Sequence, residues 1–517
     1  MLFEKLFKPP KKVLSLESRR QSPIQHQAVD LSVETNVQKI IQSLGNQADL
    51  VVHYLTGDAG IYGAVMYLSS LTNSKLLSEQ VIKPLKNLRI SKVTQTDIPF
   101  ITNALTVSAL NKFSDLKEAT DYLLSGGSLL FLQGAEDVLA FCFPGFPKRQ
   151  VQESITEQTL EGAKEGLTEV INDNIAMIRR WIKDPNLQVE KVFIGERTNT
   201  ETVVMYLKDV ANPDIVSEVH QRLKKIKIDG IVESGYISEL ISDNRLTLFP
   251  LVQETERPDK VVAALLEGRV AILVDQSPFA IIVPVTSAEF YQTPADFYYN
   301  YWVATFFRFL RAFGTLTAIT LPGLYLAVLS VNPELAPPRL IQVISSGRVQ
   351  IPFPLLVETL ITLLILEIFR EASVRIPANI NLILGIAGGI LMGLGAIESG
   401  LVSGTTLVIA FLTTLASFST ANNHKEQAWR LVRYFLLFAG GTFGILGLTL
   451  AGLVVLTHLA TLKSFGISYL GPWAPPQPVD MIDAFFRLPW WLSHRRPPIY
   501  RPQQEDRMDN TLCEDEK

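Results

Sequence analysis

The stretch "FREASVRIPANINLILGIAGGILMGLGAIESGLVSG", residues 369–404, decides the fold of this chain. Its charged start is followed by 22 uncharged residues, 376–397, and the run ends at one carboxylate, Glu398. A helix needs about 20 apolar residues to cross the hydrocarbon core of a bilayer. The stretch therefore predicts a membrane-spanning helix.

Further uncharged runs of similar or greater length lie in the same half of the chain. The four runs are 312–333, 376–397, 399–424 and 434–462, and none occurs before residue 300. A mean hydropathy of +0.21 with 19% charged residues fits a chain of 517 residues whose polar and apolar parts are separated along its length. We predict a multidomain protein with an N-terminal two-lobed α/β soluble domain, followed by an all-α multipass membrane domain of four or five spanning helices.

The soluble half divides into a tail and two subdomains. Residues 1–48 are polar and mixed in charge, which predicts a mobile N-terminal tail. Strand and helix patterns then predict one α/β subdomain over 49–147 and a second over 150–290. The basic start of the chain lacks the apolar segment of a secretory signal, so we expect both subdomains to be cytoplasmic.

The membrane domain is predicted over 300–462. The stretch 352–369 either crosses or forms a short helix buried against its neighbours, because Glu358 and Glu367 interrupt it. Nine positions apart, these carboxylates point to opposite faces of a helix and cannot both face one polar lumen. The predicted spans are about 308–331, 352–369 with its crossing open, 378–397, 401–421 and 431–459.

Residues 463–517 are predicted to form a polar C-terminal tail. Basic residues in "SHRRPP", 493–498, and in the loop 422–433 favour the cytoplasmic side. Five full spans that start inside would instead leave the tail outside. Either 352–369 does not cross, or the tail breaks the positive-inside rule.

Signatures of enzymes and cofactor sites are missing. The six histidines never occur at metal-ligand spacing, and the motifs HExxH, CxxC and GxSxG do not appear. No basic patch interleaved with aromatic residues indicates nucleic-acid binding. We therefore expect a protein that is not an enzyme and has no cofactor, metal site or nucleic-acid partner.

Glycines in the predicted spans indicate close helix packing. Small residues four positions apart let two backbones approach in lipid, where apolar helices gain little from burial against each other. The packing is either within one chain or between subunits. The glycines with this spacing are Gly385, Gly389, Gly393, Gly440 and Gly444.

A hydroxylated stripe follows in the next span. Its members are Thr406, Ala410, Thr413, Ser417 and Thr420, at spacings of 4, 3, 4 and 3. One helix face of this kind either lines a water-filled path or docks on the glycine face of the preceding helix.

Glu398, at the end of a span, also has two interpretations. It is either a functional carboxylate or a solvated turn residue.

Six blocks in the chain resemble the GerA family, the A subunits of bacterial spore germination receptors. They are "IRRWIKDPNL", "VANPDIVSEVHQRLKKIKIDGIVESGYISELI", "TERPDKVVAALLEGRVAILVDQSPFAIIVP", "REASVRIP", "AIESGLVS" and "LKSFGISYL". The resemblance runs in order from about Ala48 to Tyr500. The chain departs from the family pattern at "EGAKEGL", with Ala163 and Leu167, and at His53 and Tyr54.

The resemblance implies a multipass protein of the inner spore membrane with its soluble domain in the spore core. It implies a transporter-like B subunit that holds the nutrient and a lipoprotein C subunit as partners. It further implies that A subunits oligomerise into a cation channel that opens when nutrient binds.

In that reading Gly389 and Gly393 set helix approach, Thr406, Thr413, Ser417 and Thr420 are candidate pore lining, and Glu398 is a mouth carboxylate. The alternative is a non-conducting scaffold that assembles and couples the receptor. A secondary transporter is disfavoured because we see no internal repeat in the sequence.

Overall fold

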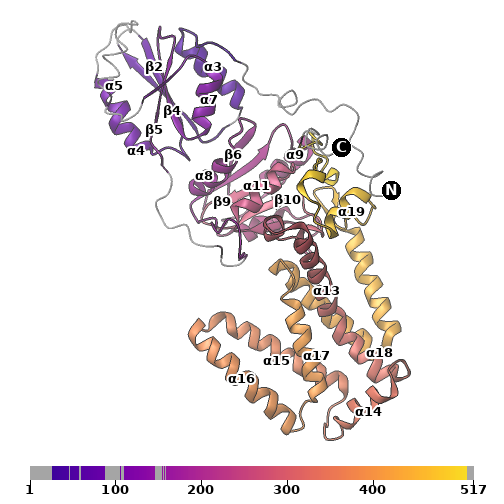
Figure 1. Cartoon of the computed structure of the whole chain (residues 1–517). Coiled ribbons are helices and arrows are strands. Elements are labelled where there is room, and N and C mark those ends of the chain that lie inside the picture. Colours follow the sequence, from indigo (N-terminus) through magenta and orange to yellow (C-terminus); the bar gives the residue numbers. More distant parts are fainter. Residues whose placement is uncertain are drawn as a thin grey trace.

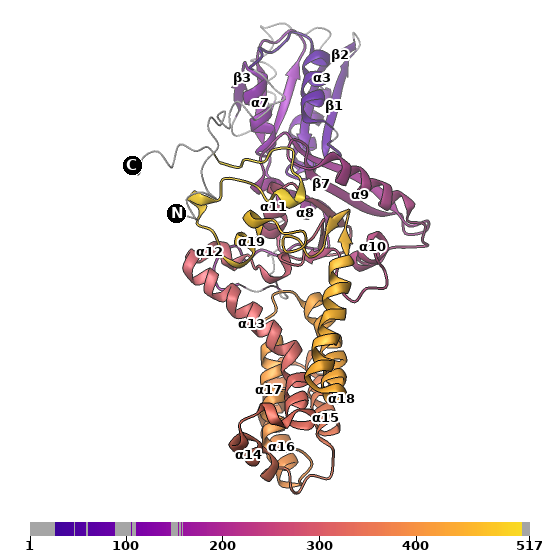
Figure 2. The same ribbon diagram turned by 90° about the vertical axis from the view of Figure 1, so that its right-hand side faces the viewer.

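The structure is a computed structural model. It describes residues 26–508 except residues 46, 58–59, 88–104, 106–109, 146–153, 155–156 and 158. Figure 1 shows two stacked α/β lobes with a bundle of helices extending from the second lobe. The same division is visible after a quarter turn in Figure 2.

The first subdomain is a five-stranded antiparallel sheet with helices on both faces. The strand order is β1-β2-β4-β5-β3. Helices α3 and α7 cover one face, and the helical segment from α4 to α5 covers the other. The elements are α3 (Val33–Leu44), β1 (Leu50–Gly57), β2 (Gly60–Leu68), α4 (Ser74–Leu77), a π-helical turn (Ser78–Ile82), α5 (Lys83–Asn87), β3 (Asn111–Phe113), α7 (Leu116–Leu124), β4 (Gly127–Leu132) and β5 (Val138–Cys142).

Helix α3 lies inside the segment predicted as a mobile tail, so that prediction was wrong for residues 33–44. Ser32 caps the helix, because its hydroxyl accepts a hydrogen bond from the Thr35 amide. The apolar residues at helical spacing face the sheet and are fully buried, while the polar residues that suggested a tail mostly face outward. Those buried apolar residues are Val33, Val37, Ile40 and Leu44.

The second subdomain has the strand order β6-β7-β9-β10-β8, also antiparallel. Helices α8 and α11 pack on one face, and α9 and α10 pack on the other. The elements are α8 (Ile171–Trp181), β6 (Leu187–Ile194), β7 (Thr200–Leu207), α9 (Pro213–Lys225), α10 (Ser234–Ile241), β8 (Gln253–Thr255), α11 (Pro258–Leu266), β9 (Val270–Val274), β10 (Ala280–Val283) and a 3-10 turn (Glu289–Tyr291).

The two subdomains repeat one topology, which the sequence analysis missed. Each runs helix, hairpin, helical segment, short strand, helix, hairpin, and each sheet places its strands in the equivalent order. The same pair of side-chain hydrogen bonds to the backbone also occurs in both subdomains. The Asn36 amide bonds both backbone groups of Asp30, and the Asn174 amide bonds both backbone groups of Thr168, six residues earlier in each case.

A buried ion pair joins the two subdomains. Arg179 of α8 donates to both carboxylate oxygens of Asp49, at 2.7 and 2.8 Å, and to the Gln47 side chain. Arg179 and Asp49 are each at most 1% exposed. Removing either partner would leave the other charge buried without compensation, so the pair fixes the two sheets to each other.

The helical bundle follows the second subdomain. Its helices are α12 (Ala295–Tyr298), α13 (Tyr301–Leu326), a π-helical turn (Ala327–Val331), a 3-10 turn (Pro333–Leu335), α14 (Pro338–Ser346), α15 (Leu355–Arg375), α16 (Ala378–Glu398), α17 (Gly404–Ser417) and α18 (Asn423–Thr461). By length and composition, Tyr301–Val331 and Asn423–Thr461 are the described helices long and apolar enough to cross a membrane. Helix α17 has 14 residues, about 21 Å, and is shorter than the predicted span 401–421.

Helix α18 folds back on itself at Gly444, whose φ of 66° and ψ of −149° are not helical. Both ends of α18 reach the soluble part, because the Lys425 ammonium donates to the Ser287 carbonyl oxygen and the His458 ring bonds the Thr247 hydroxyl. The turn lies at the opposite end of the bundle, where the Ile445 amide donates to Asn332. The single span predicted over 431–459 is therefore corrected to two antiparallel legs.

This fold-back makes six passes along the bundle. Helices α13 and α16 and the first leg of α18 run away from the soluble part, and α15, α17 and the second leg return. Contacts at both ends fix these directions, since Glu358 bonds Ser403 far from the soluble part and Arg370 pairs with Glu426 near it. Six passes bring the C-terminal segment back to the side of the α/β lobes.

The C-terminal segment packs on the second subdomain, so the predicted polar tail was wrong for residues 463–508. Its apolar side chains Phe465, Ile467 and Tyr500 complete the core on the α9–α10 face. The backbone amide of Gln503 donates a hydrogen bond to the Val210 carbonyl oxygen at 2.8 Å. The elements are β11 (Lys463–Ser464), β12 (Ile467–Ser468), α19 (Pro478–Phe485) and 3-10 turns at Trp490–Leu492 and Pro498–Tyr500.

Candidate functional site

The hydroxylated stripe of α17 faces the inside of the bundle. The Thr406 hydroxyl lies 3.0 Å from that of Tyr325 on α13, and Thr420 lies 3.1 Å from Thr315 on the same helix. Helix α17 therefore turns its stripe toward α13, not toward the glycine face of the preceding helix, and that predicted docking was wrong.

The remaining stripe residues are also satisfied inside the chain. Thr413 is fully buried and donates to the Ile409 carbonyl oxygen, while Ser417 accepts from Arg370 of α15 at 2.8 Å. Within one chain the stripe is a packed interface between α13, α15 and α17. A water-filled path along it would need these helices to separate.

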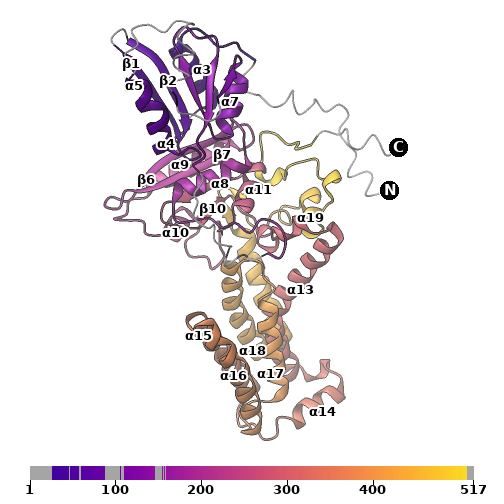
Figure 3. The ribbon, with the colours of Figure 1, turned by 60° about the vertical axis from the view of Figure 1, so that its left-hand side comes forward.

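The glycines of α16 face open space. A Cβ added at Gly385 or Gly389 would meet no atom within 4 Å, and one at Gly393 would only touch Leu407 at 3.6 Å. Within the chain, close helix packing at these glycines is thus contradicted. Figure 3 shows α16 at the outside of the bundle, beside α15. A hollow of about 630 Å³ lies between α15, α16 and α17, and these glycines line it.

The glycines of α18 serve two different purposes. A Cβ at Gly440 would lie 2.5 Å from the carbonyl oxygen of Gly323 in α13, so the two backbones are in direct contact there, as predicted. Gly444 instead supplies the positive φ of the fold-back, and an added Cβ would collide with the Asn332 side chain. Its predicted packing role is corrected to that of a turn.

The two carboxylates that left the crossing of α15 open both form ion pairs. Glu358 is fully buried and accepts from Arg348 at 3.1 Å and from the amide and hydroxyl of Ser403, each at 2.7 Å. Glu367 pairs with Arg430 and Arg433 of α18 at 2.9 and 2.5 Å. The two side chains meet different neighbours.

Glu398 is the last residue of α16 and is exposed. It lies at the end of the bundle that is remote from the soluble part, where the next turn brings Gly400 close to the Gln350 backbone. Its position agrees with a carboxylate in contact with water.

Charged anchors join the bundle to the soluble part, and the sequence analysis missed their partners. Arg308 and Arg311 of α13 both pair with the buried Asp296 of α12, at 3.2 and 2.5 Å. Lys425, also buried, donates to Ser287. The available signal was the position of each charge just outside an apolar run.

A second cluster of charges lies at the same level of the bundle. Arg370 of α15 pairs with Glu426 at 2.5 Å, and Arg430 lies 3.4 Å from the same carboxylate. Among the described residues, no three His, Cys, Asp or Glu side chains are placed to hold a metal ion. This second cluster joins α15 to α18 within the bundle.

The family described as "Bacillus/Clostridium GerA spore germination protein" matches residues 38–499 of the chain. The chain belongs to this family. Spore germination protein KA of Bacillus subtilis (strain 168) is 35% identical over 468 residues, which cover 90% of this chain and 86% of that protein. Spore germination protein GerLA of Bacillus cereus is 31% identical over 463 residues, which cover 89% of this chain and 94% of that protein.

The resemblance of the sequence blocks to the GerA family is thus confirmed. Among solved structures, the N-terminal domain of the A subunit of the Bacillus megaterium spore germinant receptor GerK3 is 31% identical and covers 50% of this chain and 97% of its own, with a TM-score of 0.39.

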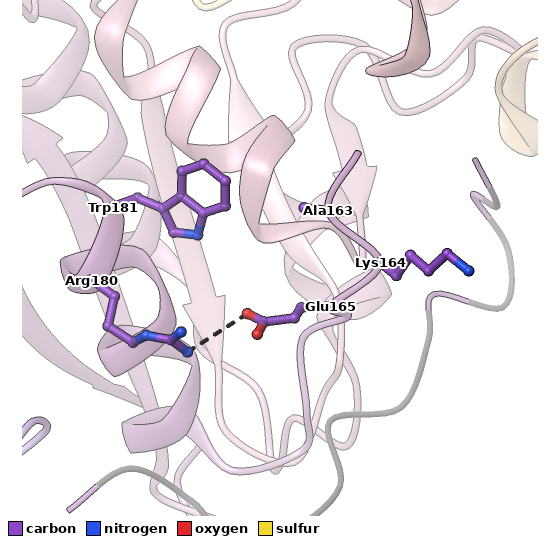
Figure 4. Close-up of a pocket in the computed structure, with 5 residues that line it drawn as sticks. All are labelled: Ala163, Lys164, Glu165, Arg180 and Trp181. Atoms are coloured by element: carbon purple, nitrogen blue, oxygen red, sulfur yellow. Dashed lines mark ion pairs between the residues drawn. The ribbon is translucent and has the colours of Figure 1, made fainter. Parts of the chain in front are cut away.

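The segment "EGAKEGL", in which a departure from the family pattern is expected, lies partly on the surface. Ala163, Lys164 and Glu165 line a hollow of about 490 Å³ with Arg180 and Trp181 at the end of α8, as Figure 4 shows. Arg180 and Glu165 face each other at 3.7 Å, and both side chains are more than a third exposed. A solvated pair of this kind contributes little to stability, so the change at residues 163–165 alters a surface. Leu167, at the end of the same segment, is buried in the core of the second subdomain.

Proposed function

We propose that this chain is the A subunit of a nutrient-responsive spore germination receptor in the inner membrane of the spore. The observation that carries the germination role is the family match over nearly the whole chain, together with relatives named as spore germination proteins. The proposed subunit is not an enzyme. Its proposed partners are a transporter-like B subunit that holds the nutrient and a lipoprotein C subunit.

The proposed membrane domain comprises the six passes of the bundle. The neutralised carboxylates Glu358 and Glu367 support a crossing of α15, because paired charges are tolerated among helices. The lobes and the C-terminal segment would then face the spore core together. This placement also reconciles the basic "SHRRPP" segment with the positive-inside rule.

Thiol labelling of intact cells tests this placement in a Cys142→Ser, Cys513→Ser background. Ser346→Cys, exposed in α14 at the remote end, should react with a membrane-impermeant maleimide. Arg501→Cys, exposed in the C-terminal segment, should react only after the membrane is permeabilised. Labelling of both positions in intact cells would put Arg501 on the outer side of the membrane. It would thereby exclude an even number of crossings between the lobes and Arg501.

We further propose that several copies assemble around α16 and conduct cations when nutrient binds the complex. The hollow beside the glycine face supports this, since Gly385 and Gly389 leave room there for a second backbone. Glu398 would attract cations at the mouth of the path. The buried positions of Thr406, Thr413 and Ser417 move the proposed path from α17 to α16.

The alternative is a scaffold that couples the other subunits while ions pass elsewhere. The closed interior of the single chain favours it, because the hydroxylated stripe is fully packed. Both proposals predict assembly of copies. Only ion flux separates them.

The test is nutrient-triggered cation efflux from cells that make the chain with its two partner subunits. Gly389→Leu and Glu398→Gln should block or retune efflux at equal protein level. Gly452→Leu is the matched control, because a Cβ at Gly452 on α18 also meets no atom within 4 Å. Normal efflux in both α16 variants would contradict the channel proposal and favour the scaffold.

A further inference from the structure

A cavity of about 450 Å³ lies in the soluble part, where three distant segments of the chain meet. Helix α11 forms one wall and the segment from Glu289 to Tyr298 forms another. The C-terminal segment closes the third side with Trp490, Arg496 and Arg507. A cavity of this size suits a small molecule of mononucleotide dimensions.

Aromatic side chains rim this cavity and remain partly open to solvent. Trp181 is 52% exposed, Tyr298 39% and Trp490 46%. The Phe297 and Trp490 rings lie 5.9 Å apart between centroids. Exposed aromatic surface gathered around one hollow is typical of a site that stacks a planar ring.

The lining also includes a hydrogen-bond donor without a partner. Gln253 of β8 is 1% exposed, and its Oε1 accepts from the Arg269 guanidinium at 2.8 Å. Arginine only donates, so this bond fixes the orientation of the amide. Its Nε2 then has no acceptor among the described residues. A buried donor of this kind calls for an acceptor from a bound molecule.

Two guanidinium groups add positive charge beside the rim. Arg496 donates to the carbonyl oxygens of Leu266, Gln504 and Asp506, all neutral acceptors. The ion pair of Arg507 with Glu267 is long, at 3.8 Å. Burial, and then the neighbouring Arg507, lower the pKa of Arg496, while the carboxylates of Asp209, Asp506 and Glu267 oppose that shift. An anionic group placed here would relieve the repulsion between the two arginines.

We propose that this cavity binds a planar aromatic anion, with its ring against Trp490 and Tyr298, a ring acceptor on Gln253 Nε2 and its charge beside Arg496 and Arg507. The proposal does not rest on ion conduction or on the germination role. Carboxylate and phosphate are two sources of the same charge. A bound anion would tie the C-terminal segment to α11.

Calorimetric titration of the purified full-length chain tests the site. The probes are adenosine 5′-monophosphate and nicotinate, which carry a phosphate and a carboxylate, and their neutral counterparts adenosine and nicotinamide. Ala263→Trp, at an exposed α11 position that lines the cavity, fills the mouth without disturbing the core. Gln221→Trp, exposed on α9, is its matched control. Arg507→Gln is compared with Arg501→Gln.

At least one anion should bind at least tenfold more tightly than its neutral counterpart. Ala263→Trp and Arg507→Gln should each weaken that binding at least tenfold, while the two controls leave it unchanged. The anion that binds identifies phosphate or carboxylate as the source. No binding of either anion at about 1 mM, equal binding of the neutral compounds, or normal binding by Ala263→Trp would each overturn the proposal.

Discussion

Two glycine-rich helix faces in the bundle share one sequence spacing and have opposite surroundings. On α18, the backbone of Gly440 is in direct contact with the backbone of Gly323 on α13. On α16, Gly385 and Gly389 face nothing within reach of a Cβ. The first face packs against another helix of the chain, and the second lines a hollow between α15, α16 and α17.

The difference shows what a four-residue glycine spacing can and cannot predict. The spacing states that a second backbone can come close, because no side chain keeps it away. It carries no information on which helix comes close, since the partner is set by the path of the whole chain. Substitutions at the two faces should therefore have unequal effects.

The largest effect is expected from Gly440→Leu. Its side chain must push α13 and α18 apart, at a cost of about 3 kcal/mol in the free energy of unfolding. Chemical unfolding of the purified chain in detergent measures this loss. Gly385→Leu serves as the control and should unfold like the parent chain. Equal losses in both variants would remove the distinction between the faces.

Gly444→Ala should come next. Alanine rarely adopts φ of 66° with ψ of −149°, so strain of about 1–3 kcal/mol is expected, with a further collision at Asn332. The same unfolding measurement applies, and Gly452→Ala on the second leg is the matched helical control. An unchanged midpoint for Gly444→Ala would argue against the fold-back of α18.

Glu358→Leu tests a packed interface held by charge. The change leaves Arg348 and the Ser403 amide without their acceptor, which should cost about 2 kcal/mol. The double variant Arg348→Leu, Glu358→Leu should recover part of that loss, because it removes the unpaired charge. Additive losses in the double variant would show that the pair is not coupled.

The smallest effect should come from Gly389→Ala. In the isolated chain, alanine favours the helix over glycine by up to about 1 kcal/mol and meets no neighbour, so a slight gain in stability is expected. Sedimentation in detergent would report any weakening of assembly between copies. A clear loss of stability in the isolated chain would mean that α16 is packed within it.

The sequence predicted the two α/β subdomains and most helices of the bundle, because apolar periodicity and long uncharged runs are local properties. It did not predict the turn at Gly444. There the glycine spacing matched a packing motif, and the 29 uncharged residues of 434–462 were read as one long span. That excess over about 20 residues was the missed signal.

The environment of the carboxylates on α15 was equally hidden. Their opposite directions follow from helix geometry, but their pairing depends on arginines that other helices supply. Arg348 comes from the segment after α14, and Arg433 lies on α18. Such partners are set by tertiary packing, which periodicity does not describe.

The completion of the second core by Phe465, Ile467 and Tyr500 has a consequence for biosynthesis. The ribosome makes the strands of this subdomain long before these three side chains exist. Part of the apolar face of this lobe therefore stays uncovered until the helices of the bundle have been translated. Only a chain translated beyond Tyr500 can close that face, so a product that stops earlier would stay recognisable to the proteases that remove incomplete proteins.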